Sequence, residues 1–262
     1  MFLARISSNH RWYSFHLAGF LFAMAMRLIP RQRRFRVALL VTRAALPLIR
    51  RTEAYRELRK AKVDGLREIA LYFILECLTR HGTRFDPVIN VTDYEKVERA
   101  LAAGRGVLSI SPHTVLSVLL ARLFHDAGHD PVIITADPRM RVGGTILAAE
   151  VIQPSPTFLV ATRNRLRRGR IVCAMTDRSE AREGRTVEFA TTRGRIIIAT
   201  ALMRVAARSE AKVVFSEAHL DERGIVITFA TPSSSSDSAE AITRDFIEFV
   251  RAHIEARSPQ DY

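Results

Sequence analysis

The sequence predicts an α/β fold with a mixed central sheet flanked by helices, preceded by an N-terminal helical, membrane-binding segment. Over residues 81–262, short apolar segments of strand length alternate with segments of helical period, as in α/β domains. Two strand-like segments at 212–219 and 224–230 lie so close in sequence that they read as a hairpin, which makes the sheet mixed. We therefore expect a helical segment over 1–80 and an α/β domain over 81–262.

The net charge of +13 belongs almost entirely to the N-terminal part of the chain. Residues 1–70 carry 15 Lys and Arg against 4 Asp and Glu, whereas residues 71–262 carry 25 against 23. A basic segment that is also rich in apolar residues is typical of a protein that meets an anionic membrane surface. Nucleic acid is not expected as a partner, because the basic residues alternate with long apolar runs rather than with stacking aromatics.

Residues 11–29 form the most apolar part of this segment. Their uninterrupted apolar stretch, Leu17–Met26, contains only 10 residues, and a spanning helix needs about 20. This length favours a helix lying in the membrane interface over a true membrane anchor, with a signal peptide or a buried helix as further alternatives. Pro30 is followed by a basic run that either binds phospholipid headgroups or forms a solvated face. The run consists of Arg31, Arg33, Arg34 and Arg36.

The other elements follow from apolar period and turn residues. Helices are expected at 35–50 and 53–80. A Thr-x-x-Glu capping box, Thr92 to Glu95, opens a further helix, and Gly128 ends another. The expected strands are 88–91, 107–111, 131–136, 171–175, 212–219 and 224–230. The expected helices are 95–103, 114–127, 139–149, 158–168, 196–208 and 239–256.

The stretch around His113 is the most informative local pattern. The apolar strand Val107–Ser111 stops at Pro112, and His113 follows at the mouth of the next helix. Open α/β sheets place their sites at the carboxyl ends of strands. His113 is therefore a general base, a substrate-binding residue in a domain that does not catalyse, or a structural histidine.

As a base, the imidazole of His113 needs a group that orients it. Ser117, a backbone carbonyl and a distant carboxylate such as Asp177 are the candidates. The N-terminus of the following helix also favours the neutral imidazole, which is the form that a base requires.

The order of elements resembles that of the bacterial late acyltransferases of lipid A biosynthesis and their relatives that acylate phosphatidylinositol mannosides. These proteins form a branch of the lysophospholipid acyltransferase superfamily. The resemblance covers nearly the whole chain, and an ordered set of pieces carries it rather than one motif. After the apolar helix and its basic flank, these are Tyr94–Val107 leading to His113, Arg168–Val172 leading to Asp177, Val187–Phe189 with Thr191-Thr192, a small-residue helix, and the strand Ala211–Val214.

The resemblance implies transfer of a fatty acyl group from acyl carrier protein or acyl-CoA to a hydroxyl or amine of a lipid or amphipathic acceptor. In the family pattern, a His is followed after four residues by Asp or Glu, and the carboxylate orients the His that takes the acceptor's proton. Here His113 is present, but Val118 occupies the position of the acid. The alternative is a catalytically impaired lipid-binding or scaffold relative. The implied location is the cytoplasmic face of the bacterial inner membrane, peripheral or singly anchored.

Asp177 and several arginines complete the candidate site. Asp177 follows the strand 171–175, where the family has an Asp-containing turn, so it supplies the missing carboxylate, shapes the acceptor site, or caps backbone amides. Five arginines lie between 163 and 170, and those that are not solvated would bind a donor phosphate, an acidic carrier-protein helix or a lipid headgroup. The candidates are His113 and Asp177 for catalysis, and Arg139, Arg163, Arg178 and Ser117 for substrate binding.

No metal or tightly bound cofactor is expected. Cys77 and Cys173 lie far apart and match no metal or redox spacing. The chain has neither a Gly-x-Ser-x-Gly nucleophile elbow nor a phosphate-binding glycine loop. The other histidines, His219 and His253 among them, show no ligand pairing and are expected at the surface or in the core.

Overall fold

The computed structural model describes residues 20–49, 70–71, 74, 88–135, 141–142, 145–146, 149–177, 186–191, 194–221, 224–233 and 238–256. The chain divides into two compact units. The first comprises Met1–Val88, Gly143–Thr145 and Glu222–Gly224, and the second comprises Ile89–Val142, Ile146–Asp221 and Ile225–Tyr262.

In the first unit, residues 20–27 are helical and helix α2 spans Arg31–Ile49. The Arg34 side chain joins the two, because its Nε donates to the carbonyl of Ile29 (2.9 Å) and its NH2 to that of Arg27 (3.1 Å). These carbonyls lie at the end of the first helix and just beyond it, where backbone acceptors lack helical partners. None of the described helices combines the length and the apolar character that crossing a bilayer requires.

The buried and exposed residues of this unit fall at helical spacing. Buried residues recur on one stripe of α2 as Phe35, Ala38, Leu39 and Thr42. Large apolar side chains are exposed elsewhere, and Leu28 is 88% accessible. The others are Phe20, Leu21, Met24 and Leu40. Arg27, Arg31, Arg33 and Arg36 are exposed as well.

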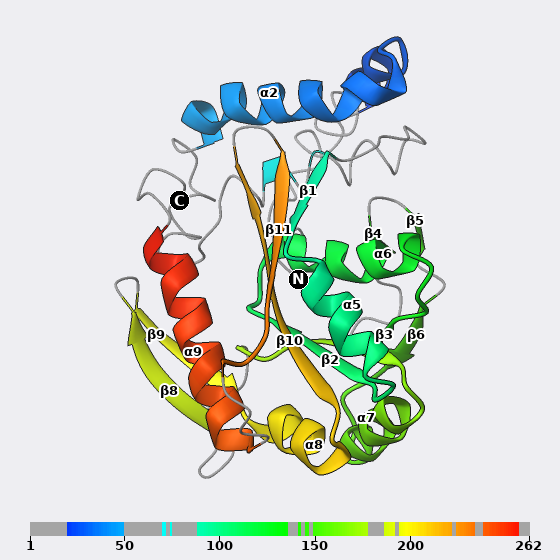
Figure 1. The fold of residues 1–262 in the computed structure, drawn as a ribbon. Helices are drawn as coiled ribbons and strands as arrows, with labels where there is room; N and C mark the ends of the chain where they lie inside the picture. The colour runs from blue at the N-terminus through cyan, green and yellow to red at the C-terminus, as the bar shows by residue number, and fades with distance from the viewer. Residues whose placement is uncertain are drawn as a thin grey trace. The chain divides into compact units, whose positions relative to one another are not determined.

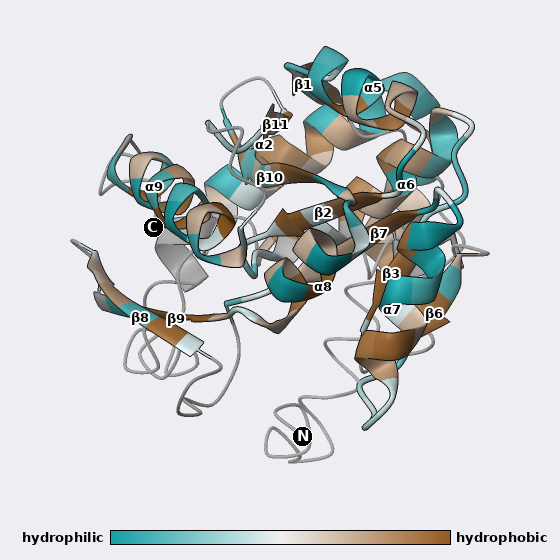
Figure 2. Ribbon diagram, turned by 60° about the horizontal axis from the view of Figure 1, so that its bottom comes forward, coloured by the Kyte–Doolittle hydropathy of each residue, from teal (hydrophilic) through white to brown (hydrophobic). Residues whose placement is uncertain are grey.

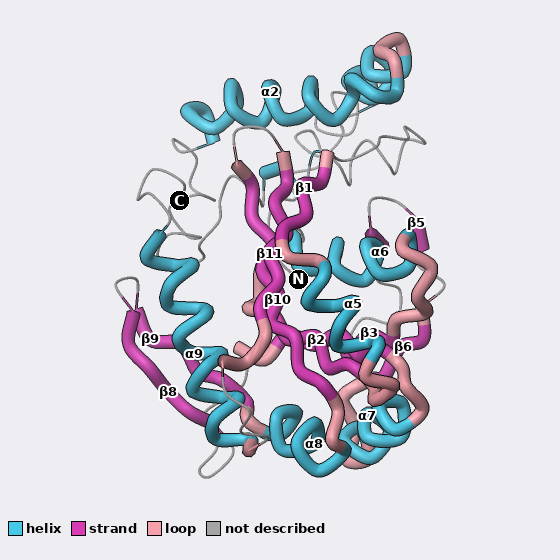
Figure 3. Tube along the Cα trace, in the orientation of Figure 1, coloured by secondary structure: helices cyan, strands magenta, loops and turns pink. Residues whose placement is uncertain are grey.

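The second unit contains a seven-stranded sheet among its described residues (Figures 1 and 3). The strand order is β1-β11-β10-β2-β7-β3-β6. Strand β11 runs antiparallel to β10 and parallel to β1, whereas β10, β2, β7, β3 and β6 are mutually parallel. The expectation of an α/β fold with a mixed central sheet flanked by helices is therefore confirmed. The strands are β1 (Ile89–Thr92), β2 (Val107–Ser111), β3 (Val132–Ile134), β6 (Glu150–Ile152), β7 (Ile171–Met175), β10 (Lys212–Leu220) and β11 (Ile225–Ala230).

Helices cover both faces of this sheet, as Figure 2 shows. On one face lie α5 (Glu95–Ala102) and α6 (Val118–Asp126), whose Phe124 packs against Phe229 of β11 at 5.8 Å between ring centroids. The other face carries α7 (Phe158–Arg167), α8 (Ala201–Ser209) and α9 (Ala239–Ala256). Burying apolar side chains on both faces explains why the parallel strands read as nearly continuous hydrophobic runs.

An aromatic cluster fixes α9 on its face of the sheet. Phe215 of β10 lies 5.3 Å from Phe246 and 5.6 Å from Phe249 between ring centroids. Phe215 and Phe246 are almost completely buried. Such aromatic pairs contribute about 0.5–1.5 kcal/mol beyond the area they bury.

One expected helix is wrong in this structure, and another begins later than expected. Residues 139–149 contain the short strands β4 (Arg141–Val142) and β5 (Thr145–Ile146), which form a two-stranded sheet. The sequence at Gly143-Gly144 disfavours a helix, because glycine has a low helix propensity. The helix expected at 196–208 begins only at Ala201, because Ile196–Ile198 lie in β9 (Gly194–Ala199), antiparallel to β8 (Thr186–Thr191). A run of β-branched residues packs better on a pleated surface than in a helix.

The expected capping box is also wrong. Thr92 is the last residue of β1, and its Oγ1 lies 3.0 Å from Oγ1 of Thr228 on the neighbouring strand. Tyr94 takes the N-cap position of α5, and no side chain makes a capping hydrogen bond there. Asp93, at φ 61°, supplies the sharp turn between strand and helix.

Candidate active site

The carboxyl ends of β2 and β7 bring His113 and Asp177 together. The strands are parallel, and their register pairs Ser111 with Met175. The backbone N–H of Thr176 then donates to the carbonyl of Ser111 (3.3 Å), which extends the pairing beyond the strands. His113 and Asp177 each stand two residues after their strand, so the register itself places them opposite one another.

Nδ1 of His113 lies 3.7 Å from Oδ1 of Asp177. The His113 side chain is 37% exposed and the Asp177 side chain 16% exposed. This is an ion-pair distance, longer than the 2.7–3.2 Å of an ordinary N–H···O hydrogen bond. Catalytic hydrogen bonds are often long without substrate and shorten in the substrate complex. Asp177 can therefore orient the imidazole after a small side-chain adjustment.

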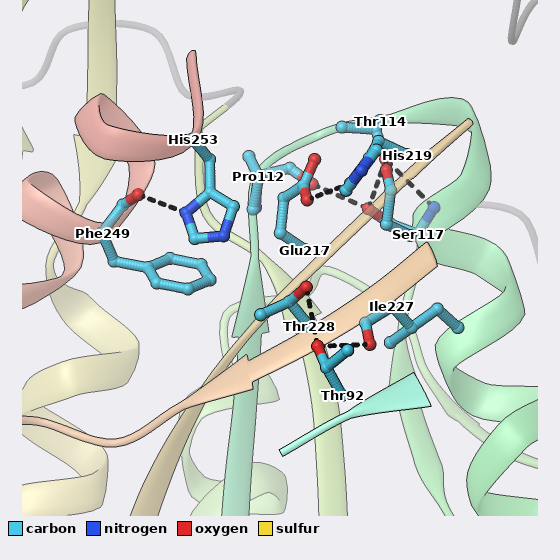
Figure 4. A network of polar contacts seen from close by, with 11 residues as sticks. Thr92, Pro112, Thr114, Ser117, Glu217, His219, Ile227, Thr228, Phe249 and His253 are labelled. Carbon is cyan, nitrogen blue, oxygen red and sulfur yellow. Dashed lines mark hydrogen bonds and ion pairs between the residues drawn. The ribbon is translucent and has the colours of Figure 1, made fainter. Parts of the chain in front are cut away.

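A network of hydrogen bonds holds the backbone on both sides of His113 (Figure 4). Ser117 Oγ donates to the carbonyl of Pro112 (2.9 Å). Thr114 Oγ1 donates to the carbonyl of Ala218 on β10 (3.2 Å) and accepts from the backbone N–H of Ser117 (3.2 Å). The last bond caps the 3₁₀ turn Val115–Ser117, which leads into α6.

These bonds define the surroundings of Ser117, which was a candidate for substrate binding. Ser117 is 4% exposed, and its Oγ lies within hydrogen-bond distance of Pro112 and Thr114. Its hydroxyl supports the turn that carries His113. Val118 is the first residue of α6, and the carboxylate beside His113 comes from the end of β7 instead.

Two electrostatic effects act on the His113 ring in opposite directions. The backbone N–H groups of the helical segment that begins at Val115 favour the neutral imidazole. The Asp177 carboxylate stabilises the imidazolium that forms when the ring accepts a proton. A histidine whose neutral ring faces helical N–H groups and whose protonated ring faces a carboxylate has the surroundings that a general base requires.

Some of the arginines in and just after α7 form ion pairs with acidic residues, and others face the solvent. Arg165 Nε donates to Glu150 (2.6 Å), and Arg170 pairs with Asp130 (2.7 Å). The bond from Arg165 is the largest of the effects that hold the pKa of Glu150 below its ordinary value, although burial opposes them. Arg163, a candidate for substrate binding, is exposed on α7. The other arginine candidates, Arg139 and Arg178, lie outside the described residues.

Sequence reasoning missed a second histidine–carboxylate pair. Glu217 and His219 occupy alternate positions near the carboxyl end of β10, so their side chains share one face. His219 Nδ1 lies 2.8 Å from Glu217 Oε2, and the Glu217 side chain is 2% exposed. The signal was a carboxylate two residues before a histidine in a strand that is mostly apolar. Within the ranges described above, no three His, Cys, Asp or Glu side chains are grouped so as to hold a metal ion.

A scan against protein-family models finds no match for this chain, and a search of curated proteins finds none either.

Proposed function

We propose that this protein transfers a fatty acyl group from an acyl thioester, carried by acyl carrier protein or coenzyme A, to a hydroxyl or amine of a lipid-like acceptor. The approach of His113 to Asp177 across the ends of β2 and β7 carries the proposal, because it supplies the carboxylate that the local His-x4 pattern lacks. The glycerolipid acyltransferase-like fold belongs to the same proposal, as does the resemblance to the late acyltransferases of lipid A biosynthesis.

In the proposed step, His113 is the general base. Asp177 faces Nδ1, and Nε2 takes the proton of the acceptor hydroxyl or amine. The acceptor oxygen or nitrogen attacks the thioester carbonyl, and the carbon–sulfur bond breaks as the tetrahedral intermediate collapses. The acyl chain leaves on the acceptor and the carrier leaves as its thiol. No metal or bound cofactor takes part in these steps.

The basic N-terminal segment supports a membrane-bound acceptor. Residues 20–49 contain six arginines and no acidic residue, and exposed apolar side chains such as Met24 and Leu28 accompany them. Two contributions bind a peripheral protein to a membrane. Apolar side chains enter the interface, and arginines contact anionic headgroups. We propose that the protein acts at the cytoplasmic face of a bacterial inner membrane, where acyl carriers and lipid acceptors meet.

The experiment combines the purified full-length chain, acyl carrier protein or coenzyme A thioesters, and extracted lipids in anionic vesicles, with acylated products detected by mass spectrometry. Transfer is expected, and His113→Ala is expected to abolish it. His125→Ala on α6 is the matched control, because His125 is an exposed histidine away from the site.

The alternative function is lipid binding or scaffolding without catalysis, and the position of Val118 favours it, since a valine cannot orient an imidazole by hydrogen bonding. Vesicle binding without transfer, or transfer that His113→Ala leaves unchanged, would contradict the acyltransferase proposal. Vesicle binding alone does not separate the two functions, because both require it.

A further inference from the structure

The Glu217–His219 pair lies at the same edge of the sheet as His113. Strands β10 and β2 are parallel neighbours, and their register pairs Phe215 with Ile110. The bond from Thr114 Oγ1 to the carbonyl of Ala218 ties the residue after His113 to the residue before His219 (Figure 4). Two histidines that each face a carboxylate therefore stand at the carboxyl ends of adjacent strands.

The two histidines differ in how strongly their surroundings stabilise the protonated ring. A general acid needs this stabilisation more than a general base does. Asp177 lies 3.7 Å from the His113 ring, and a helical segment begins just after His113. Glu217 lies 2.8 Å from the His219 ring and is almost completely buried. Coulomb attraction grows as distance and local dielectric fall, so Glu217 stabilises an imidazolium more strongly than Asp177 does. Pairs of titratable groups whose environments differ in this way commonly divide the acid and base roles.

Helix α9 packs against β10, the strand that carries His219. His253 stands in the last turn of α9, where the helix dipole is negative. Its Nδ1 donates to the carbonyl of Phe249 (2.8 Å), and its ring lies beside the Phe249 ring, 4.2 Å between centroids (Figure 4). Burial lowers the pKa of His253, the bond to Phe249 opposes this, and the proximity of His219 lowers the pKa further. The lowered pKa favours the neutral ring of His253 at pH 7, so that His253 places little positive charge against the His219 ring.

We propose that His219, held by Glu217, is the general acid that protonates the leaving thiolate, while His113 is the base that takes the acceptor's proton. This inference rests on the proposed acyl transfer. The bond to Glu217 occupies Nδ1 of His219, and the side chain is 27% exposed, so Nε2–H is the atom that donates.

The protons taken up and released during the proposed cycle are equal in number. The acceptor proton passes to His113 as the carbon–oxygen or carbon–nitrogen bond forms. The proton on His219 Nε2 passes to sulfur as the carbon–sulfur bond breaks. His113 then releases its proton to water, and His219 takes one from water, so that each turnover yields one acylated acceptor and one free thiol.

The kinetic test varies the basicity of the leaving group. His219→Gln keeps a polar side chain beside Glu217 but cannot give up a proton. With acyl-CoA, whose thiolate is basic, this variant is expected to lose about 10²- to 10⁴-fold in kcat. With the acyl thioester of thiophenol, whose thiolate leaves without a proton, the loss is expected to stay within about 3-fold of the unaltered protein. His113→Ala is expected to lose transfer from both donors.

Equal losses by His219→Gln with both donors would overturn the assignment of His219 as the acid and leave the acyl transfer itself standing. The absence of transfer by the unaltered protein would remove the proposed function and, with it, this step. His125→Gln is the matched control for substitution of an exposed histidine.

Ring nitrogen chemical shifts give a readout that needs no turnover. With ¹⁵N-labelled histidine, the His219 ring is expected to be doubly protonated at pH 7, and Glu217→Gln is expected to make it neutral. A neutral His219 ring in the unaltered protein at pH 7 would overturn the proposal. A circular dichroism melt of each variant shows that the fold is retained.

Discussion

Asp177 Oδ1 lies 3.7 Å from His113 Nδ1, although the two residues follow different strands. The parallel register of β2 and β7 produces this approach, because it places the two strand ends level with one another. A carboxylate at the end of a neighbouring strand can face the imidazole in place of one supplied by the next turn of a helix. The proposed dyad therefore has a different local sequence from the His-x4-acid pattern.

The first prediction concerns the role of Asp177. Asp177→Asn keeps the shape of the side chain but removes its charge, so it cannot stabilise the imidazolium of His113. Acyl transfer is expected to fall by up to about 10⁴-fold, the loss that follows when the orienting Asp of a serine protease is neutralised. Adding His113→Ala to this variant is expected to cost little beyond His113→Ala alone, because residues that act as a unit are not additive. Unchanged transfer in Asp177→Asn, with Asp126→Asn as the control, would contradict the dyad.

The second prediction concerns membrane binding by α2. Arg33 and Arg36 are exposed on this helix, and each arginine near an anionic leaflet contributes about 1 kcal/mol. The double change Arg33→Gln with Arg36→Gln is therefore expected to weaken binding to anionic vesicles about 30-fold. Co-sedimentation measures the change, and the same substitutions at Arg244 and Arg251 of α9 serve as the control. Equal binding by the two double variants would show that α2 does not meet the lipid.

The third prediction concerns the reactivity of Cys173, which lies in β7. Burial raises the pKa of Cys173 to about 12, and only the thiolate reacts with alkylating agents. Iodoacetamide at pH 8 is expected to leave Cys173 unmodified in the folded protein and to modify it fully in denaturant. Peptide mapping by mass spectrometry reads out the position. Rapid labelling of the folded protein would show that this strand opens readily.

The fourth prediction concerns stability in mild acid. Burial lowers the pKa of His253 below its ordinary 6.5, His219 lowers it further, and the bond to Phe249 opposes both. The unfolded chain therefore binds a proton near pH 6.5 that the folded protein resists, and the folded state loses stability as the pH falls through this value. Urea unfolding at pH 5.0 and 7.5 is expected to show a smaller loss in His253→Gln than in the unaltered protein. An equal loss would show that His253 titrates alike in both states.

The fifth prediction contrasts two glycines before β2. A Cβ on Gly106 would overlap the backbone of Leu166, whose carbonyl accepts the Gly106 N–H (3.1 Å). A Cβ on Gly104 would meet open space, although its φ of 68° disfavours other residues. Gly104→Ala is expected to cost about 1 kcal/mol of stability. Gly106→Ala is expected to cost about 3 kcal/mol or more, because one of the two backbones must move. Equal costs in urea unfolding would contradict the close approach.

The sequence by itself determined the elements with strong local signals. The strands Val107–Ser111 and Ile171–Met175 and the helix Ala239–Ala256 have the bounds that apolar period and turn residues predict. Local signals predicted the wrong element where one stretch of sequence suits both a helix and a strand. The run Ile196–Ile198 fits either an apolar helix face or a strand, and only its pairing with β8 decided for the strand.

Only the tertiary structure determined which histidine lies beside which carboxylate. No periodicity in the sequence relates His113 to Asp177, because their approach depends on which strands become neighbours and in what register. The same holds for His219, which sequence reasoning assigned to the surface or the core and which the structure places against Glu217. Strand order and register come from packing the whole sheet between its helices, and this long-range information is absent from any short stretch of the chain.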